Sequence, residues 1–191
     1  MALLCLVLAS SRVAAADAGQ PNIGLTEAEV LAAVIDHGRS ADHSLLVIAD
    51  ETTADPAALT ANDETLALLA RDLALPAGLV TDWARRNAER SPLDRPLALT
   101  VSYRAVSRKT LDELFDGVDP AAGWERFYAH FAGAPGLLRV SRVGFDEFAL
   151  SALVYVELQC GADCGSARLV HLDRAAGSWQ VKDAVLVWMT D

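Results

Sequence analysis

Hydrophobic and polar positions change their period along this chain, from about 3.6 residues in the first two thirds to two residues after Leu137. A period of 3.6 is typical of an amphipathic helix, and a period of two is typical of a strand with one buried face. The pattern therefore predicts helices first and a sheet last.

The last quarter of the chain predicts three antiparallel strands, over residues 148–160, 167–174 and 179–189, joined by short turns. Alternation predicts that one face of the first strand carries Phe148, Leu150, Ala152, Val154, Val156 and Leu158. One face of the last strand is expected to carry Trp179, Val181, Val185 and Val187. The turns are short enough for a meander.

The first half predicts a helix from Thr26 to Gly38, followed by a buried strand over residues 44–49. Thr26 and Glu29 have the spacing of a capping box, in which each side chain accepts from the other's backbone N–H. Gly38 is a typical residue after a helix end.

Further helices are expected over residues 64–73 and 76–90, and a strand over 97–103. Thr110 and Glu113 form a second capping-box pattern. A helix capped by Asp119, with Pro120 as its first residue, carries an aromatic stripe. Its members are Trp124, Phe127, Tyr128 and Phe131. We expect this stripe to pack on the C-terminal meander.

The order of elements predicts an α+β fold in which helical N-terminal and middle segments pack on a C-terminal antiparallel meander. A cone-shaped NTF2-like arrangement is one variant that this order allows. We see no linker or repeat that would divide residues 19–191, so a single domain is expected.

Residues 1–18 resemble a cleaved secretory signal, with a short apolar run followed by small residues in an A-x-A spacing. The run is too short to span a bilayer. No Lys or Arg precedes it, and a buried N-terminal helix or strand is the alternative. Cys5 lies within the apolar run and is expected to be removed with the peptide. The sequence therefore predicts an exported, periplasmic or secreted protein with no integral membrane segment after cleavage.

Cys160 and Cys164 would remain in the mature chain, and an even number of cysteines in an oxidising compartment favours a structural disulfide. A redox-active pair and a metal site are the alternatives. Reactive pairs usually lie at a helix N-terminus, where a thiolate is stabilised, whereas these flanks are strand-like. A metal site would need two more ligands, so no metal is expected.

The formal net charge of −10, with 52% hydrophobic and 22% charged residues, indicates an acidic globular protein. Nucleic-acid binding needs clustered Lys and Arg to replace counterions on phosphates, and no such cluster is present. The chain also lacks the nucleotide-binding and hydrolase motifs that would imply a cofactor or a nucleophile, and no cofactor is expected.

Four residues are candidates for lining a ligand pocket. Asp50 follows a buried strand, where carboxylates are often catalytic, although the same residues make a good turn. Arg142 precedes Gly144 and could hold a carboxylate or phosphate; pairing with Asp146 or Glu147 at a bulge is the alternative. The other two candidates lie on predicted strands and are Tyr155 and His171. His171 could meet Asp173 or Glu157 across the sheet.

Several C-terminal segments resemble a group of exported bacterial proteins that has no assigned function. The resemblance rests on the segments SRVGF at 141–145 and ALVYV at 152–156, and on a CG-x-x-CG-like turn at 160–165. The strand after the turn departs from that group. The resemblance implies export and a single domain, and it transfers no catalytic residue.

Three functions follow as hypotheses. The first is a non-enzymatic binding domain of the cell envelope, whose partner is a protein, a peptide or an envelope component. The second is a hydrolase or small-molecule-binding enzyme with a pocket between helices and sheet. The third is a thiol-redox protein that uses Cys160 and Cys164.

Overall fold

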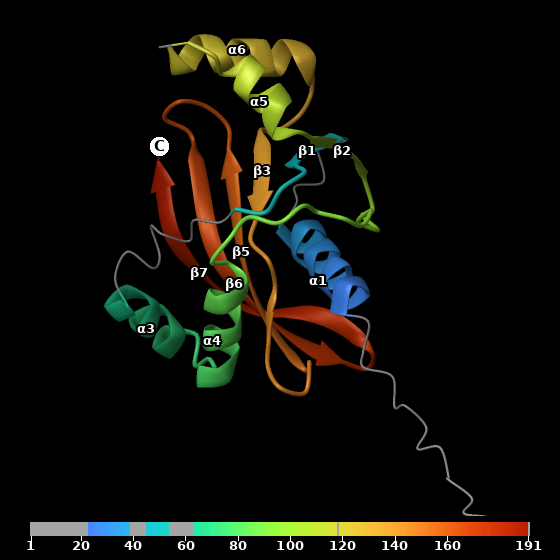
Figure 1. The fold of residues 1–191 in the computed structure, drawn as a ribbon, viewed down its shortest axis with the longest axis vertical. Coiled ribbons are helices and arrows are strands. Elements are labelled where there is room, and N and C mark those ends of the chain that lie inside the picture. The colour runs from blue at the N-terminus through green and yellow to red at the C-terminus, as the bar shows by residue number, and fades with distance from the viewer. Residues whose placement is uncertain (1–22, 39–44, 54–62, 118, 191) are drawn as a thin grey trace, which may run out of the picture.

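The computed structural model describes residues 23–38, 45–53, 63–117 and 119–190, and it has an α+β fold built on one seven-stranded mixed sheet (Figure 1). The strands are β1 (Leu45–Ala49), β2 (Ser102–Val106), β3 (Leu137–Val140), β4 (Gly144–Phe145), β5 (Ser151–Gln159), β6 (Gly165–Ala175) and β7 (Ser178–Thr190). The helices are α1 (Ile23–Gly38), α3 (Asp63–Asp72), α4 (Ala77–Arg86), α5 (Arg108–Leu114) and α6 (Pro120–His130). The predictions for residues 1–18 lie outside the described residues.

The sheet has the order β2-β1-β3-β5-β6-β7, with β4 paired to β5. The expected meander is present as the antiparallel strands β5, β6 and β7. An additional parallel part was not predicted: β1 pairs in parallel with both β2 and β3. The continuous apolar sequence of β1 suits a strand covered on both faces, as parallel strands usually are.

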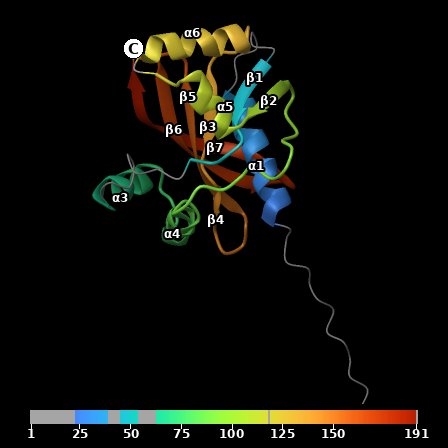
Figure 2. The ribbon, with the colours of Figure 1, turned by 45° about the horizontal axis from the view of Figure 1, so that its top comes forward.

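Helices cover both faces of this sheet. On one face, α1 packs against alternate residues of β1 and β5, such as Ile48 and Val154. On the other face, α5 and α6 cover β1 and β3, while α3 and α4 cover β5 and β6. The two helix pairs are well separated, with α5 and α6 near the top of Figure 1 and α3 and α4 at the lower left; Figure 2 shows the same separation.

The aromatic stripe of α6 packs against β1 and β3, which corrects the expectation that it would pack on the meander. Phe127 is fully buried in a cluster with Val47 and Leu137. Only Tyr128 reaches the meander, through a hydrogen bond from its hydroxyl to the carbonyl of Cys160 (2.8 Å). The parallel strand β1 supplies the apolar surface that sequence analysis had assigned to the meander.

Both capping-box predictions are wrong. Helix α1 begins at Ile23, so Thr26 lies inside it and is buried. Helix α5 is capped by Ser107, whose hydroxyl accepts from the Thr110 N–H (3.1 Å). Serine and threonine are almost equivalent caps, so the local sequence does not fix which of two nearby residues begins the helix.

Two strand predictions are shifted at their ends. The strand expected over 97–103 is β2 at 102–106, because pairing with β1 fixes it; the Leu97 N–H instead donates to the Tyr103 hydroxyl. Residues 148–150 form a turn before β5, and Phe148 and Leu150 are 71% and 54% exposed. Asp146 accepts hydrogen bonds from the backbone there, which ends the strand pattern.

The predicted face of the last strand is also wrong, because β7 is irregular. Its pairing with β6 shifts between His171 and Leu172 and again between Ala167 and Arg168. A bulge places one extra residue on a strand and so changes which face the following side chains occupy. Trp179 therefore packs in the α1 cluster, whereas Val185 packs in the α3–α4 cluster.

Helix α4 lies directly on the backbone of β4. A Cβ atom added to Gly144 would lie 2.4–2.7 Å from the backbone N, Cα and Cβ of Trp83. These are not the far ends of flexible side chains, so the helix would have to move. Gly144→Ala is therefore expected to lower the free energy of unfolding by about 1–3 kcal/mol, the usual range for overpacking.

Gly78→Ala is the matched control for this prediction. Gly78 lies in α4, the helix that contacts Gly144, and it has open space around it. Alanine has a higher helix propensity than glycine, so this variant should be at least as stable as the wild type in urea unfolding. Equal stability of the two variants would contradict the close contact between α4 and β4.

Candidate functional site

The four pocket residues expected from the sequence do not come together. Asp50 lines an open crevice of about 380 Å³, and Arg142 lines a different pocket of about 230 Å³. Tyr155 and His171 are buried side chains, 3% and 2% exposed. Each residue therefore has to be judged by its own contacts.

Arg142 holds α1 to the connection between β3 and β4. Its guanidinium donates to the Glu27 carboxylate, with an Nη2–Oε2 distance of 3.0 Å, and the Val143 N–H donates to the same carboxylate (2.9 Å). The hydrogen bond to Glu27 raises the pKa of Arg142. The partner of Arg142 is thus Glu27, which corrects the alternative pairing with Asp146 or Glu147.

Tyr155 is part of a hydrogen-bonded group inside the fold. Its hydroxyl accepts from the Trp188 indole N–H (3.0 Å) and donates to the Glu157 carboxylate (3.1 Å). Burial raises the pKa of Tyr155, and the charge of Glu157 adds to this. A phenol held neutral in this way is a poor acid or base, so the contacts indicate a structural role.

His171 forms a contact with Ser151 and Asp173 that has the residue types of a catalytic triad but a different geometry. The Ser151 hydroxyl lies 2.7 Å from His171 Nε2, and the Asp173 carboxylate lies 3.4 Å from the same nitrogen. In a working triad the two partners occupy opposite ring nitrogens. Here Nδ1 is buried without a hydrogen-bond partner among the described residues, so the carboxylate cannot orient the ring for base catalysis.

The crevice beside Asp50 is lined by charges of both signs. It lies at the carboxyl end of β1, beside α5, and Arg139 and Glu157 form its sheet side. These two side chains already pair with each other, and Arg139 also donates to Gln159. On the α5 side, Arg108 lies 3.9 Å from Asp112. Four of the charged side chains that line the crevice are therefore paired with one another.

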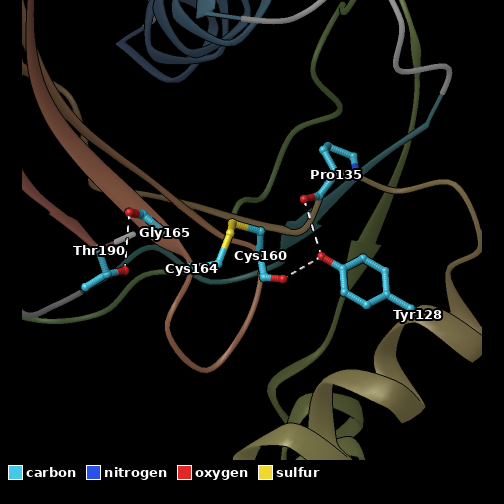
Figure 3. The surroundings of a disulfide bond; sticks show 6 residues. All are labelled: Tyr128, Pro135, Cys160, Cys164, Gly165 and Thr190. Carbon is cyan, nitrogen blue, oxygen red and sulfur yellow. Dashed lines mark hydrogen bonds between the residues drawn. A yellow bond between two sulfur atoms is a disulfide. The ribbon is translucent and has the colours of Figure 1, made fainter.

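The Cys160–Cys164 disulfide closes the turn between β5 and β6, with a Cα–Cα distance of 5.0 Å. Figure 3 shows that α6 approaches this turn through Tyr128, which donates to the carbonyls of Cys160 and Pro135. The cysteines lie in a hairpin, and neither of them is at the N-terminus of a described helix, so the arrangement lacks the usual stabilisation of a reactive thiolate. Its contacts are those of a structural cross-link.

A predominantly apolar groove of about 330 Å³ lies between α1 and the sheet. Its roof is the C-terminal part of α1, including Val34 and Ile35. Its floor comes from five strands and comprises Leu46, Leu138, Val156, Leu158, Ser166, Arg168, Val170, Val181 and Ala184. Volumes of 300–1,000 Å³ with apolar walls and few polar groups are typical of small-molecule sites.

The sheet face beside this groove stays partly uncovered. Leu186 pairs with Arg168 and Met189 pairs with Ser166, which places both apolar side chains next to the groove floor. They are 47% and 61% exposed. The groove thus continues into an exposed apolar strip on β7.

Within residues 23–38, 45–53, 63–117 and 119–190, no three His, Cys, Asp or Glu side chains are grouped so as to hold a metal ion. None of the helices in these ranges is both long and apolar enough to cross a membrane. The chain matches no protein-family model, no curated protein and no solved structure. The geometry of the described residues is therefore the basis for judging the site.

The groove residues are not evident from the sequence, because none of them belongs to a recognisable motif. Ser166 and Arg168 are polar residues of the kind expected on the exposed face of a strand. Their shared face could have been read from the alternation, but the bulges that bring Ala184 and Leu186 to the same face could not. The groove depends on pairing between distant segments.

The burial of His171 predicts a pH dependence of stability. Desolvation lowers the pKa of His171 below its ordinary value of 6.5, while the nearby Asp173 opposes this shift. As the pH falls below 6.5, His171 is protonated in the unfolded chain before it is protonated in the folded protein. The free energy of unfolding therefore decreases below pH 6.5, until the pH reaches the lower pKa of His171 in the folded protein. His171→Gln should reduce the loss between pH 7.5 and 5.5 by about 1 kcal/mol.

Urea unfolding of both proteins at the two pH values measures this difference. Asp173 does not interfere, because its pKa is also lowered, from an ordinary value of 3.8. Parallel pH dependences of the wild type and the variant would show that His171 takes up protons equally well in the folded state.

Proposed function

We propose that this chain is an exported, non-enzymatic binding domain of the cell envelope, and that its ligand is held in the groove between α1 and the sheet. The observation that carries the proposal is the groove itself: about 330 Å³ in volume, predominantly apolar, and continuous with exposed Leu186 and Met189. Exposed apolar surface of this kind commonly marks a binding site.

The contacts of the polar candidates support binding over catalysis. Arg142 is engaged with Glu27, Tyr155 with Glu157, and His171 with Ser151. A catalytic centre needs a nucleophile or base within reach of a reacting atom and donors aimed at the developing charge. These side chains instead form hydrogen bonds inside the fold.

Export is supported by the signal-like pattern of residues 1–18 and by the disulfide between Cys160 and Cys164. Disulfides persist mainly in oxidising compartments. The protein isolated from its native host should have a mass that begins between residues 16 and 19, and both thiols should be alkylated only after reduction. Retention of Met1, or alkylation without a reductant, would contradict export.

The groove proposal predicts binding of a neutral apolar probe. Nile Red should show increased fluorescence with the wild-type protein, because the groove removes it from water. Ala184→Trp should reduce this signal by at least fivefold, since Ala184 is an exposed residue of the groove floor that a large side chain would fill.

Ala105→Trp is the matched control, because Ala105 is an exposed strand residue that lies outside the groove, on the edge strand β2. It should leave the Nile Red signal unchanged. Equal signals from all three proteins, or no signal from the wild type, would contradict the proposed groove site.

A further inference from the structure

We infer that the groove binds an amphipathic molecule with an alkyl chain and a carboxylate head group, and that Arg168 holds the carboxylate. This inference rests on the groove being the ligand site, as proposed above, and it adds the chemical class of the ligand. The observation behind it is the position of one guanidinium on an otherwise uncharged floor.

Arg168 has no acidic neighbour on its face of the sheet. In the neighbouring strands it pairs with Val156 of β5 and Leu186 of β7. Along β6, the adjacent residues on the same face are Ser166 and Val170. The described residues offer Arg168 no hydrogen bond or ion pair, although the chain contains 26 acidic residues.

Three other arginines on or beside this sheet are engaged. Arg139 pairs with Glu157, and Arg142 pairs with Glu27. Arg174 lies over the Trp179 ring, 5.9 Å from its centroid. Arg168 differs from these three in presenting all five of its N–H donors to the groove and the solvent.

An anionic head group fits this position. A guanidinium binds a carboxylate through two parallel hydrogen bonds, which fixes orientation as well as adding energy. Ser166 also lines the groove on the same face and supplies a hydroxyl donor. The net charge of −10 repels anions from the surface in general, so an anion would need this local cation, and a cationic head group would meet repulsion from it.

The rest of the groove fits an alkyl chain. Beyond Arg168 the floor runs through Val156, Leu158 and Leu138, and the α1 roof adds Val34 and Ile35. Each methylene group buried there should tighten binding by about fourfold. The ligand would therefore combine one charged contact at Arg168 with apolar contact along the groove.

The test compares decanoate with 1-decanol, two probes that have the same chain length and different head groups. Isothermal titration calorimetry at pH 7.5 measures both affinities, below the critical micelle concentration of decanoate and the solubility limit of decanol. Decanoate should bind the wild-type protein about tenfold more tightly than decanol, since hydrogen bonds to charged groups are the stronger class.

Arg168→Gln removes the charge and keeps most of the side chain. It should lower the affinity for decanoate about tenfold, to the level of decanol, and leave the affinity for decanol unchanged. Arg104→Gln is the matched control: Arg104 is an exposed arginine on β2 that pairs with Val47, on the opposite face of the sheet. This variant should bind both probes as the wild type does.

The outcomes separate the two levels of the argument. If decanol binds but decanoate binds no more tightly, or if Arg168→Gln leaves decanoate binding unchanged, the carboxylate inference is overturned and the groove proposal stands. If neither probe binds the wild type, the groove proposal fails and the inference fails with it.

Discussion

The connection between β3 and β4, residues 141–143, is the constraint on which the rest of the structure depends, because helices from both faces of the sheet are attached to it. The Ser141 hydroxyl accepts from the Trp83 indole N–H and the Tyr155 backbone N–H, and it donates to the Arg142 carbonyl, so its full capacity of one donor and two acceptors is used. Asn87 of the α4 C-cap bonds to both backbone groups of Arg142. On the other face, Glu27 of α1 binds the Arg142 guanidinium. Ser141 is fully buried, so loss of one of its partners would leave a polar group buried and unpaired, which is costly.

This attachment also determines where the groove lies. Glu27, near the start of α1, is fixed at the β3–β4 connection, and the helix then crosses the sheet only as far as Gly38. Strands β6 and β7 are 11 and 13 residues long and extend past the area that α1 covers. The bulges in β7 turn Leu186 and Met189 to this uncovered area. The apolar surface is therefore a consequence of long strands, a single helix that covers part of their face, and two irregular pairings.

The sequence predicted the positions of the helices and strands better than it predicted which of them pair or pack together. The buried strand at Leu45–Ala49, the helices near 64–73 and 76–90, the aromatic stripe and the three C-terminal strands follow from local periodicity, and the structure contains all of them. Local periodicity carries no information about pairing, so the parallel contacts of β1, the bulges of β7 and the docking of α6 on β1 and β3 were missed. Arg142 shows the same limit: its partner, Glu27, is distant in the sequence, while the nearer Asp146 is used in a turn.

The candidate site residues show the same limit, because their contacts also involve distant parts of the sequence. Asp50, Arg142, Tyr155 and His171 attracted notice because their residue types carry chemistry, yet three of them, Arg142, Tyr155 and His171, form hydrogen bonds that hold the fold together. A buried polar group must be paired for the fold to be stable, so polar residues inside a domain are mostly structural. A binding group has to keep its capacity for the ligand, and Arg168 does so: apolar neighbours surround it, and solvent hydrates its guanidinium until a ligand replaces the water. A binding side chain therefore needs both a place in the groove and donors that no internal partner uses, and residue type alone reveals neither.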